Sequence, residues 1–400
     1  MLFPVIRARH WLALALLALV LAGCGRSAPV PGSQASLHLA GEPGSSPTAT
    51  PLPATPRPTI PSPTPSATPT ATPVVEIPDA DAYLTREVAA NRFSGVVLVV
   101  QNGHILLEKG YGLADREKGI PNTPQTRFHI GSLTKQFTAM LIMQLQERGK
   151  LQVGDLVSSH LPNCPSTWSA ITIDELLTHT SGLMDFFDLP GLDGLLTQRV
   201  TPDKIVNLFR DQPLLFRPGS EYSYSNSGFV LLGQIIEQAS GESYASQIQK
   251  NILTPVGMTA TTYGSSGPAG ACAVGYETAW QRAPDVDLSL GYAAGGLCST
   301  VEDLYRWDQA LNTTTLCSQA SLDAMFSPHF TLAPNVWEGY GWVIRDLSGH
   351  RRISHTGLLY GFSSINARYP DDGVTIIILS NLEDAPLTDY VDFLAKQVLK

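Results

Sequence analysis

The stretch "FSGVVLVVQNGHILLEKGYG" (residues 93–112) contains the element on which the predicted fold depends. Two runs rich in β-branched and other apolar residues flank Asn102-Gly103, the strongest short-range signal for a β-hairpin. A two-stranded hairpin is at best marginally stable in water, and open strand edges invite aggregation. Other parts of the chain must therefore supply strands that complete a sheet around this hairpin.

The C-terminal region contains the strands that could complete the sheet. Four strand-like runs, separated by glycine or by Asp-Asp-Gly, are GYGWVIRD (339–346), RRISHTG (351–357), GFSSINARYP (361–370) and VTIIILSN (374–381). We expect the hairpin to pair with these runs in one antiparallel sheet. Helices are predicted at 79–92 and 386–399, and we expect both to pack on one face of that sheet.

The middle of the chain has the apolar spacing of helices rather than strands. The helical runs are residues 132–149, 172–179, 201–211, 227–241, 243–253 and 301–311. Together these features predict an α+β fold, in which an antiparallel sheet flanked by helices is joined to an all-helical lobe. Because ligand pockets are common where two such lobes meet, we expect the functional site there.

The first residues indicate export. Arg7 and Arg9 precede the apolar run 11–22, which is too short to span a bilayer comfortably, and Gly23-Cys24 follows it. Leu21 to Cys24 is similar to a bacterial lipobox, so we predict a lipoprotein signal peptide at 1–23 and a lipid anchor on Cys24. The alternative is an ordinary signal peptide cleaved nearby.

Residues 24–78 are rich in proline, threonine and serine, with 14 of the chain's 30 prolines between residues 26 and 78. Such a segment cannot bury enough apolar surface to offset the entropy of ordering, so we predict a disordered linker. The folded domain is expected at 79–400, held away from a membrane by this stalk.

The net charge of −9 and the lack of basic clusters argue against nucleic acid as a partner. Neither the cysteines nor the histidines have the spacing of a metal site, and no cofactor is predicted. Beyond Cys24, the four cysteines allow three disulfide pairings, of which we favour Cys272 with Cys298; the other two are Cys164 and Cys317.

"HIGSLTKQF" (129–137) places Ser132 three residues before Lys135, at the start of a strongly apolar run. Residues at i and i+3 share one face of a helix. Near the positive end of the helix dipole, a partly desolvated lysine loses its proton more easily and can then activate the serine. The alternative is an N-capping serine followed by a surface lysine.

Two further motifs accompany this pair. Tyr224-Ser225-Asn226 lies immediately before an apolar helix, and His355-Thr356-Gly357 ends a strand-like run. A tyrosine can share protons with the serine and the lysine, and an asparagine amide can hold a substrate carbonyl or the lysine. A strand edge can align an extended substrate, and the glycine permits close approach of the chain. Without the other motifs, both would be ordinary turns.

S-x-x-K, Y-x-N and a basic-Thr-Gly triad, in this order, resemble the penicillin-recognising serine hydrolases, which include class C β-lactamases and D-alanyl-D-alanine carboxypeptidases. The resemblance covers 79–400 and implies a β-lactamase/transpeptidase-like fold. It implies that Ser132 is the nucleophile, Lys135 its activator and Tyr224 a proton shuttle. Asn226 would position the substrate amide. The remaining implied positions are His355, Thr356 and Gly357 as a third wall, the N–H groups of Ser132 and Leu358 as an oxyanion hole, and His179 as a structural residue.

The third triad departs from many β-lactamases because histidine replaces lysine, which weakens the positive charge facing a substrate carboxylate. We therefore hypothesise that activity on carboxylate substrates follows His355 protonation between about pH 5 and 8. The loops 185–198 and 264–271 would shape the pocket, but their composition predicts little.

The sequence thus predicts an exported, lipid-anchored serine hydrolase that cleaves amide or ester bonds of a D-amino-acid peptide, an ester or a β-lactam. The membrane would be a partner through Cys24, and no oligomeric state is predicted. The alternative is a non-catalytic penicillin-sensing or binding module of the same fold.

Overall fold

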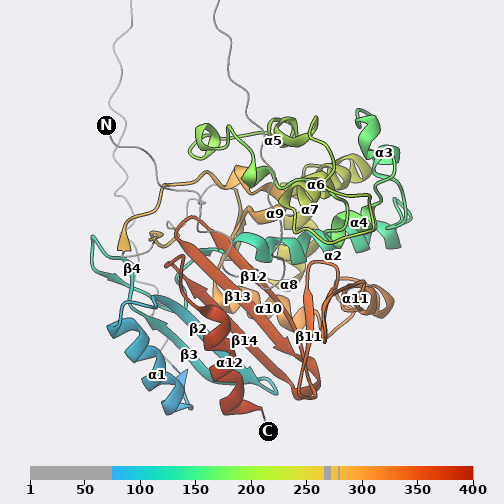
Figure 1. Ribbon diagram of the computed structural model, residues 1–400. Coiled ribbons are helices and arrows are strands. Elements are labelled where there is room, and N and C mark those ends of the chain that lie inside the picture. The colour runs from blue at the N-terminus through green and yellow to red at the C-terminus, as the bar shows by residue number, and fades with distance from the viewer. Residues whose placement is uncertain (1–73, 265–271, 278–279, 400) are drawn as a thin grey trace, which may run out of the picture. The chain divides into compact units, whose positions relative to one another are not determined.

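The computed structural model describes residues 74–264, 272–277 and 280–399. The predicted hairpin is present as β2 (Gly95–Gln101) and β3 (His104–Tyr111). Its first strand pairs antiparallel with β14 (Val374–Ser380) along its whole length, from Gly95 opposite Ser380 to Gln101 opposite Val374. The expected pairing of N-terminal and C-terminal strands is therefore confirmed (Figure 1).

The sheet has nine antiparallel strands in the order β1-β3-β2-β14-β13-β12-β11-β10-β9. The other strands are β1 (Val74–Val75), β9 (Phe330–Ala333), β10 (Val336–Glu338), β11 (Val343–Leu347), β12 (His350–Leu359) and β13 (Phe362–Tyr369). The four predicted C-terminal strands are β11 to β14. The run expected at 339–346 begins as a strand only at Val343, because Gly341 turns the chain with φ +75°.

Strand β1 corrects the predicted end of the disordered linker. Val74 and Val75 pair with Glu108 and Leu107 of β3, and the N–H of Glu76 donates to the carbonyl of Leu106 at 2.7 Å. Without β1, strand β3 would expose a row of unpaired backbone N–H and C=O groups. Valine favours the strand conformation, so Val74 and Val75 can pair with these groups as an added strand. The predicted signal peptide and the remainder of the linker lie outside the described residues.

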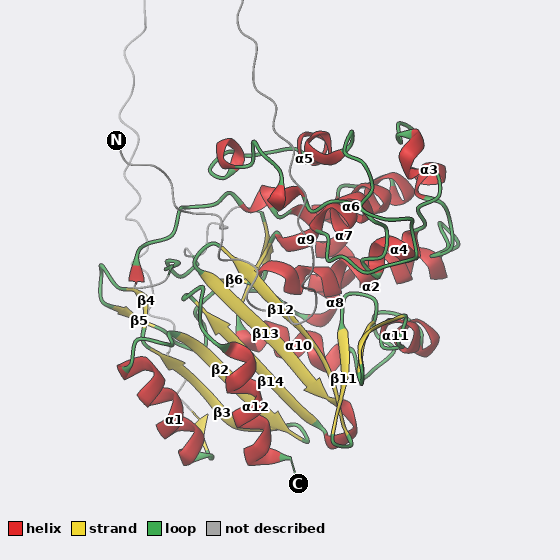
Figure 2. Ribbon diagram, viewed as in Figure 1, coloured by secondary structure: helices red, strands yellow, loops and turns green. Residues whose placement is uncertain are grey.

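The two faces of the sheet are covered by different helices, as Figure 2 shows. Val97 and Val99 belong to the core cluster under α1 (Pro78–Ala89) and α12 (Leu387–Val398), the two predicted terminal helices. Val96 and Leu98 belong to the larger cluster on the opposite face. Alternate residues of a strand point to opposite faces, so one apolar run supplies both cores.

The helical lobe contains most of the helices predicted for the middle of the chain (Figure 1). The predicted helices found there are α2 (Thr134–Glu147), α4 (Ile173–Leu177), α5 (Pro202–Phe209), α6 (Asn226–Ser240) and α7 (Tyr244–Ile248). The lobe also contains three short helices that were not predicted, α3 (Val157–His160), α8 (Thr254–Val256) and α9 (Tyr292–Gly295). The helix α11 (Gln319–Met325) precedes β9. In the described part of the chain, no helix has both the length and the hydropathy needed to span a membrane.

Helix α10 (Val301–Ala310) corrects one assignment, because it packs on the sheet instead of joining the helical lobe. Its apolar residues Leu304 and Trp307 share the large core with Val96 and Leu98 of β2. Figure 1 shows α10 behind the sheet, opposite α12. The helical spacing of this run was read correctly, but spacing alone does not say which surface a helix covers.

Two small sheets complete the fold. One pairs β4 (Leu113–Asp115) with β5 (Ile120–Pro121), and the other contains β6 (Phe128–His129), β8 (Leu297–Ser299) and β7 (Thr262–Tyr263). The favoured disulfide is confirmed, because Cys272 is bonded to Cys298 of β8, whereas Cys164 and Cys317 are free. Strand β6 leads directly into the segment that carries Ser132.

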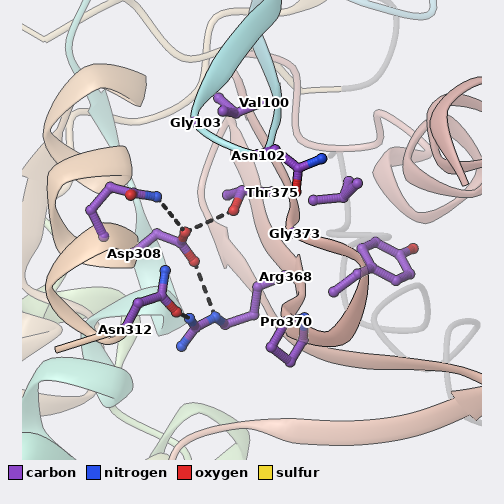
Figure 3. Close-up of a pocket in the computed structure, with 12 residues that line it drawn as sticks. Val100, Asn102, Gly103, Asp308, Asn312, Arg368, Pro370, Gly373 and Thr375 are labelled. Atoms are coloured by element: carbon purple, nitrogen blue, oxygen red, sulfur yellow. Dashed lines mark hydrogen bonds and ion pairs between the residues drawn. The ribbon is translucent and has the colours of Figure 1, made fainter.

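A buried ion pair ties the end of α10 to the sheet beside a small pocket (Figure 3). The carboxylate of Asp308 lies 3.1 Å from Nε of Arg368 and accepts a 2.7 Å hydrogen bond from the hydroxyl of Thr375. A second hydrogen bond runs from Arg368 to the side chain of Asn312. Because both charged side chains are almost fully buried, each depends on the other for compensation.

Asp308→Asn is expected to destabilise the protein by ~3–5 kcal/mol, because it leaves a buried guanidinium without its counter-charge. Replacing the pair together, as Asp308→Leu with Arg368→Met, should cost clearly less, since no buried charge remains. Urea unfolding followed by circular dichroism measures both. The control is Asp323→Asn on α11, an exposed carboxylate, which should change stability by less than about 0.5 kcal/mol. Equal losses for the single and double replacements would contradict this account of the pair.

Candidate functional site

Ser132 and Lys135 are held together where β6 passes into α2. A 3₁₀ turn, Gly131–Leu133, carries the half-buried Ser132 and continues into α2, where Lys135 is fully buried. Nζ of Lys135 donates to Oγ of Ser132 at 3.0 Å. The alternative of a capping serine and a surface lysine is therefore wrong: Ser132 makes no cap hydrogen bond at this helix start, and Lys135 has 0% exposure.

The ammonium group of Lys135 has three acceptors in total. Besides Ser132, these are Oδ1 of Asn226 at 2.7 Å and the backbone carbonyl of Ala294 at 2.9 Å. A lysine ammonium has three N–H donors, so all of them are satisfied. The acceptors come from the 3₁₀ turn, from α6 and from α9, which makes Lys135 the point where three segments of the helical lobe meet.

The predicted Tyr224 also reaches the serine. Its hydroxyl donates to Oγ of Ser132 at 2.8 Å, and its ring lies 4.9 Å below Nζ of Lys135. Burial raises the pKa of Tyr224 well above its ordinary value, so the phenol is protonated and acts as a donor at neutral pH. The structure thus brings Ser132, Lys135, Tyr224 and Asn226 together in one hydrogen-bonded group.

Burial is also the main cause of the shifted pKa of Lys135. It lowers the pKa of the lysine to about 7, although the carboxyl groups of Asp185 and Glu338 oppose the shift. Near neutral pH a substantial fraction of Lys135 is therefore uncharged, and an uncharged amine can accept a proton from the serine hydroxyl.

Strand β12 supplies the third predicted motif, and its end packs tightly against the serine turn. A Cβ atom at Gly357 would lie 2.1 Å from the carbonyl oxygen of Ile130, so only glycine fits. A Cβ atom at Gly131 would lie 2.9 Å from the backbone nitrogen of Leu358. The N–H groups of Ser132 and Leu358 are thus supplied by adjoining backbone segments. Thr356 and Leu358 are exposed on the same strand edge.

His355 does not behave as the sequence suggested. Burial, with a smaller contribution from the charge of Lys135, lowers its pKa to about 4. Its Nδ1 lies 2.6 Å from the carbonyl oxygen of Thr356 and must carry the proton that this contact requires. His355 is therefore neutral between pH 5 and 8, and the hypothesis that its protonation governs activity in that range is wrong.

His179 lies beneath Tyr224. It is almost fully buried, its Nδ1 accepts a hydrogen bond from the backbone N–H of Ser225 at 3.1 Å, and its ring is 4.3 Å from that of Tyr224. The backbone of His179 has a left-handed conformation, with φ +57°. This arrangement supports the predicted structural role, since His179 touches the tyrosine rather than the serine.

Three residues that the sequence analysis missed complete the site. Nδ2 of Asn226 donates to Oδ2 of Asp185 at 2.7 Å, and Glu338, 1% exposed, accepts a 3.3 Å hydrogen bond from Tyr222. Ala294 contributes a carbonyl oxygen that any residue would carry, so no sequence signal could identify it. Among the described residues, no group of three or more histidine, cysteine or acidic side chains could hold a metal ion.

Comparisons with known proteins identify the family and the fold of this chain. The profile named Beta-lactamase matches residues 80–399. A Bacillus subtilis protein named PbpX is 36% identical over 73% of this chain and 71% of its own length.

Two solved structures share the fold. The penicillin-binding protein of Bacillus halodurans has a TM-score of 0.72 and 29% identity over 79% of this chain and 99% of its own. The D-amino acid amidase of Ochrobactrum anthropi has a TM-score of 0.69 and 25% identity over 79% and 96%. With a family match over most of its length and a relative more than one-third identical, the chain belongs to the beta-lactamase family.

Proposed function

We propose that this protein is an exported serine hydrolase that cleaves amide or ester bonds through an acyl-enzyme on Ser132. The observation that carries the proposal is the convergence of Lys135 and Tyr224 on Oγ of Ser132, at 3.0 and 2.8 Å. A nucleophile within hydrogen-bond reach of a base that is oriented by further groups is the arrangement expected for covalent catalysis.

Acylation follows from the hydrogen bonds. Neutral Lys135 keeps two N–H groups on Asn226 and Ala294, so its lone pair faces Ser132. As Oγ attacks the substrate carbonyl, its proton passes to Nζ of Lys135. Tyr224, protonated and beside Oγ, can deliver a proton to the leaving amine or alcohol and recover one from the lysine. Water then attacks the acyl-enzyme with the same groups acting in reverse.

The developing negative charge on the carbonyl oxygen needs fixed donors. We assign this role to the backbone N–H groups of Ser132 and Leu358, which the close contact of β12 with Gly131 brings to adjoining positions. Preorganised donors of this kind typically accelerate acyl transfer ~100- to 1000-fold each. The exposed strand edge at Thr356 would align the substrate backbone.

For the substrate we propose a neutral amide or ester of a D-amino acid in preference to a β-lactam. His355 is uncharged at neutral pH, so the third wall has no fixed cation at this position for a substrate carboxylate. One solved structure with this fold is a D-amino acid amidase, which supports the same class of substrate.

Export and anchoring form part of the proposal. Residues 1–23 have the composition of a signal peptide that Cys24 follows, and the proline-rich segment to about residue 73 would act as a spacer. A lipid on Cys24 would place the hydrolase on the outer face of the cell membrane.

Ser132→Ala should abolish both covalent labelling and turnover. p-Nitrophenyl acetate should be hydrolysed only by the wild type, and any adduct that intact mass shows after incubation with benzylpenicillin should form on the wild-type chain and not on the variant. A wild-type chain that binds penicillin without forming an adduct and hydrolyses no ester would instead favour the non-catalytic binding module.

The logarithm of kcat/KM should rise with pH through about 7 and then level off, because only neutral Lys135 can accept the serine proton. Below the pKa of Lys135 the rate should fall about tenfold per pH unit. Lys135→Arg keeps the charge but cannot deprotonate, so its activity should be at least ~100-fold below the wild-type plateau above pH 7 and should show no rise with pH. An arginine variant with wild-type activity would contradict the base role of Lys135.

Cys24→Ser should move the protein from the membrane fraction to the soluble fraction of exported material, because the proposed lipid attachment would be lost. Fractionation of expressing cells, followed by immunoblotting, measures the distribution. Ser27→Ala, three residues away, is the matched control and should leave the protein with the membrane.

A further inference from the structure

The carboxylate of Asp185 occupies a position behind the reacting groups that neither the motifs nor the proposed chemistry assigns. Asp185 precedes a short 3₁₀ turn, Phe186–Asp188, and its Oδ1 accepts from the N–H of Phe187 at 3.0 Å. Its Oδ2 accepts from Nδ2 of Asn226 at 2.7 Å and from the N–H of Asn226 at 3.3 Å. One side chain thus caps two helical segments.

The contact with Asn226 determines which way its amide points. A carboxylate accepts hydrogen bonds and cannot donate them, so the amide must turn its NH₂ group toward Asp185. Its oxygen therefore faces Lys135, at 2.7 Å from Nζ. With the opposite orientation, two donors would face each other at the lysine and two acceptors at the aspartate. Asp185 thereby fixes the acceptor that holds Lys135.

We propose that Asp185 is a positioning residue that acts on Lys135 through Asn226, both by orienting the amide and by stabilising the ammonium group formed when Ser132 is deprotonated. This inference rests on the function proposed above. In that step the O–H bond of Ser132 breaks, an N–H bond forms on Lys135, and the positive charge appears two hydrogen bonds away from the carboxylate.

Other groups around Lys135 act on the same equilibrium and must be considered with Asp185. Glu338 of β10 favours the charged lysine as Asp185 does, whereas His179 and His355 lie near it and are neutral. Burial raises the pKa of Glu338 well above its ordinary value, and the hydrogen bond from Tyr222 and the charge of Lys135 oppose this shift. Burial also raises the pKa of Asp185, but four hydrogen-bond and charge contributions, from Phe187, Lys135 and Asn226, favour its ionised form.

Asp185→Asn separates the effect of the negative charge of Asp185 from its effect on the orientation of the Asn226 amide. The new amide oxygen can still accept from Asn226, but the negative charge is lost. Because a carboxylate raises the pKa of a nearby amine, its removal should lower the pKa of Lys135 and move the acid limb of the kcat/KM profile to lower pH by about one unit. The plateau should fall roughly tenfold, because the lysine becomes a weaker base.

Asp185→Ala removes the acceptor as well and releases the amide of Asn226. Its loss of kcat should be larger, about 100-fold, with a smaller change in KM. The matched control is Asp188→Asn, an exposed carboxylate in the same turn, which should leave the profile unchanged. Rescue of kcat toward wild type by Asp185→Glu would further support the role of a carboxylate.

The measurement is the pH dependence of p-nitrophenyl ester hydrolysis by the full chain and these variants from pH 5 to 9, with thermal unfolding alongside. An acid limb that keeps its midpoint in Asp185→Asn, in a protein that unfolds at the wild-type temperature, would overturn the inference. So would an equal shift in Asp188→Asn. A wild-type chain without turnover or acylation would instead refute the proposed function, and the two failures are therefore distinguishable.

Discussion

The buried amine of Lys135 is the constraint to which the rest of the site is fitted. An isolated charged group in a protein interior costs several kcal/mol, so it needs partners or must lose its charge. Lys135 meets both requirements in part, with three acceptors at 2.7 to 3.0 Å and a pKa lowered to about 7 by burial. Its acceptors come from three segments that are distant in the sequence. Packing of the helical lobe, rather than local sequence, therefore determines whether this amine can act as a base or is an uncompensated buried charge.

The sheet contributes the second half of the site by close backbone contact. Gly357 and Gly131 let β12 approach the serine turn so closely that a side chain at either position would overlap backbone atoms. The hydroxyl of Ser364 on the neighbouring strand donates to the carbonyl of Ile130 at 2.8 Å and fixes the same contact. Core clusters cover both faces of the nine-stranded sheet, so the position of the N–H group at Leu358 is determined by the packing of β12. Ser132 thus supplies both the nucleophile and one backbone donor, and the sheet supplies the other donor through Leu358 of β12.

Much of this arrangement could be predicted from the sequence, for identifiable reasons. Apolar residues that recur with a period of 2 or 3.6 indicate strands and helices directly. The Asn102-Gly103 turn indicates a hairpin, and because a hairpin needs further strands, the pairing of β2 with the C-terminal β14 could be predicted. Ser132, Lys135, Tyr224 and Asn226 were found because their chemistry resides in side chains with recognisable spacing. The carbonyl of Ala294 has no such signal, and Asp185 lies in a loop where an acidic residue is ordinary. The charge state of His355 was misjudged because burial, which spacing does not show, decides it.

The carboxylate of Asp185 has structural and electrostatic consequences together. It caps the turn after residue 185 and the start of α6, so the amide of Asn226 is oriented by the interaction that begins the helix carrying it. Stability and reactivity are coupled at this point, because removing the carboxylate weakens a helix start and frees the amide that holds Lys135. An isosteric amide separates the two effects, since it retains a hydrogen-bond acceptor but carries no charge. If the carboxylate of Asp185 raises the pKa of Lys135, then the pH dependence of kcat/KM must change when the charge is removed, even where the fold does not change.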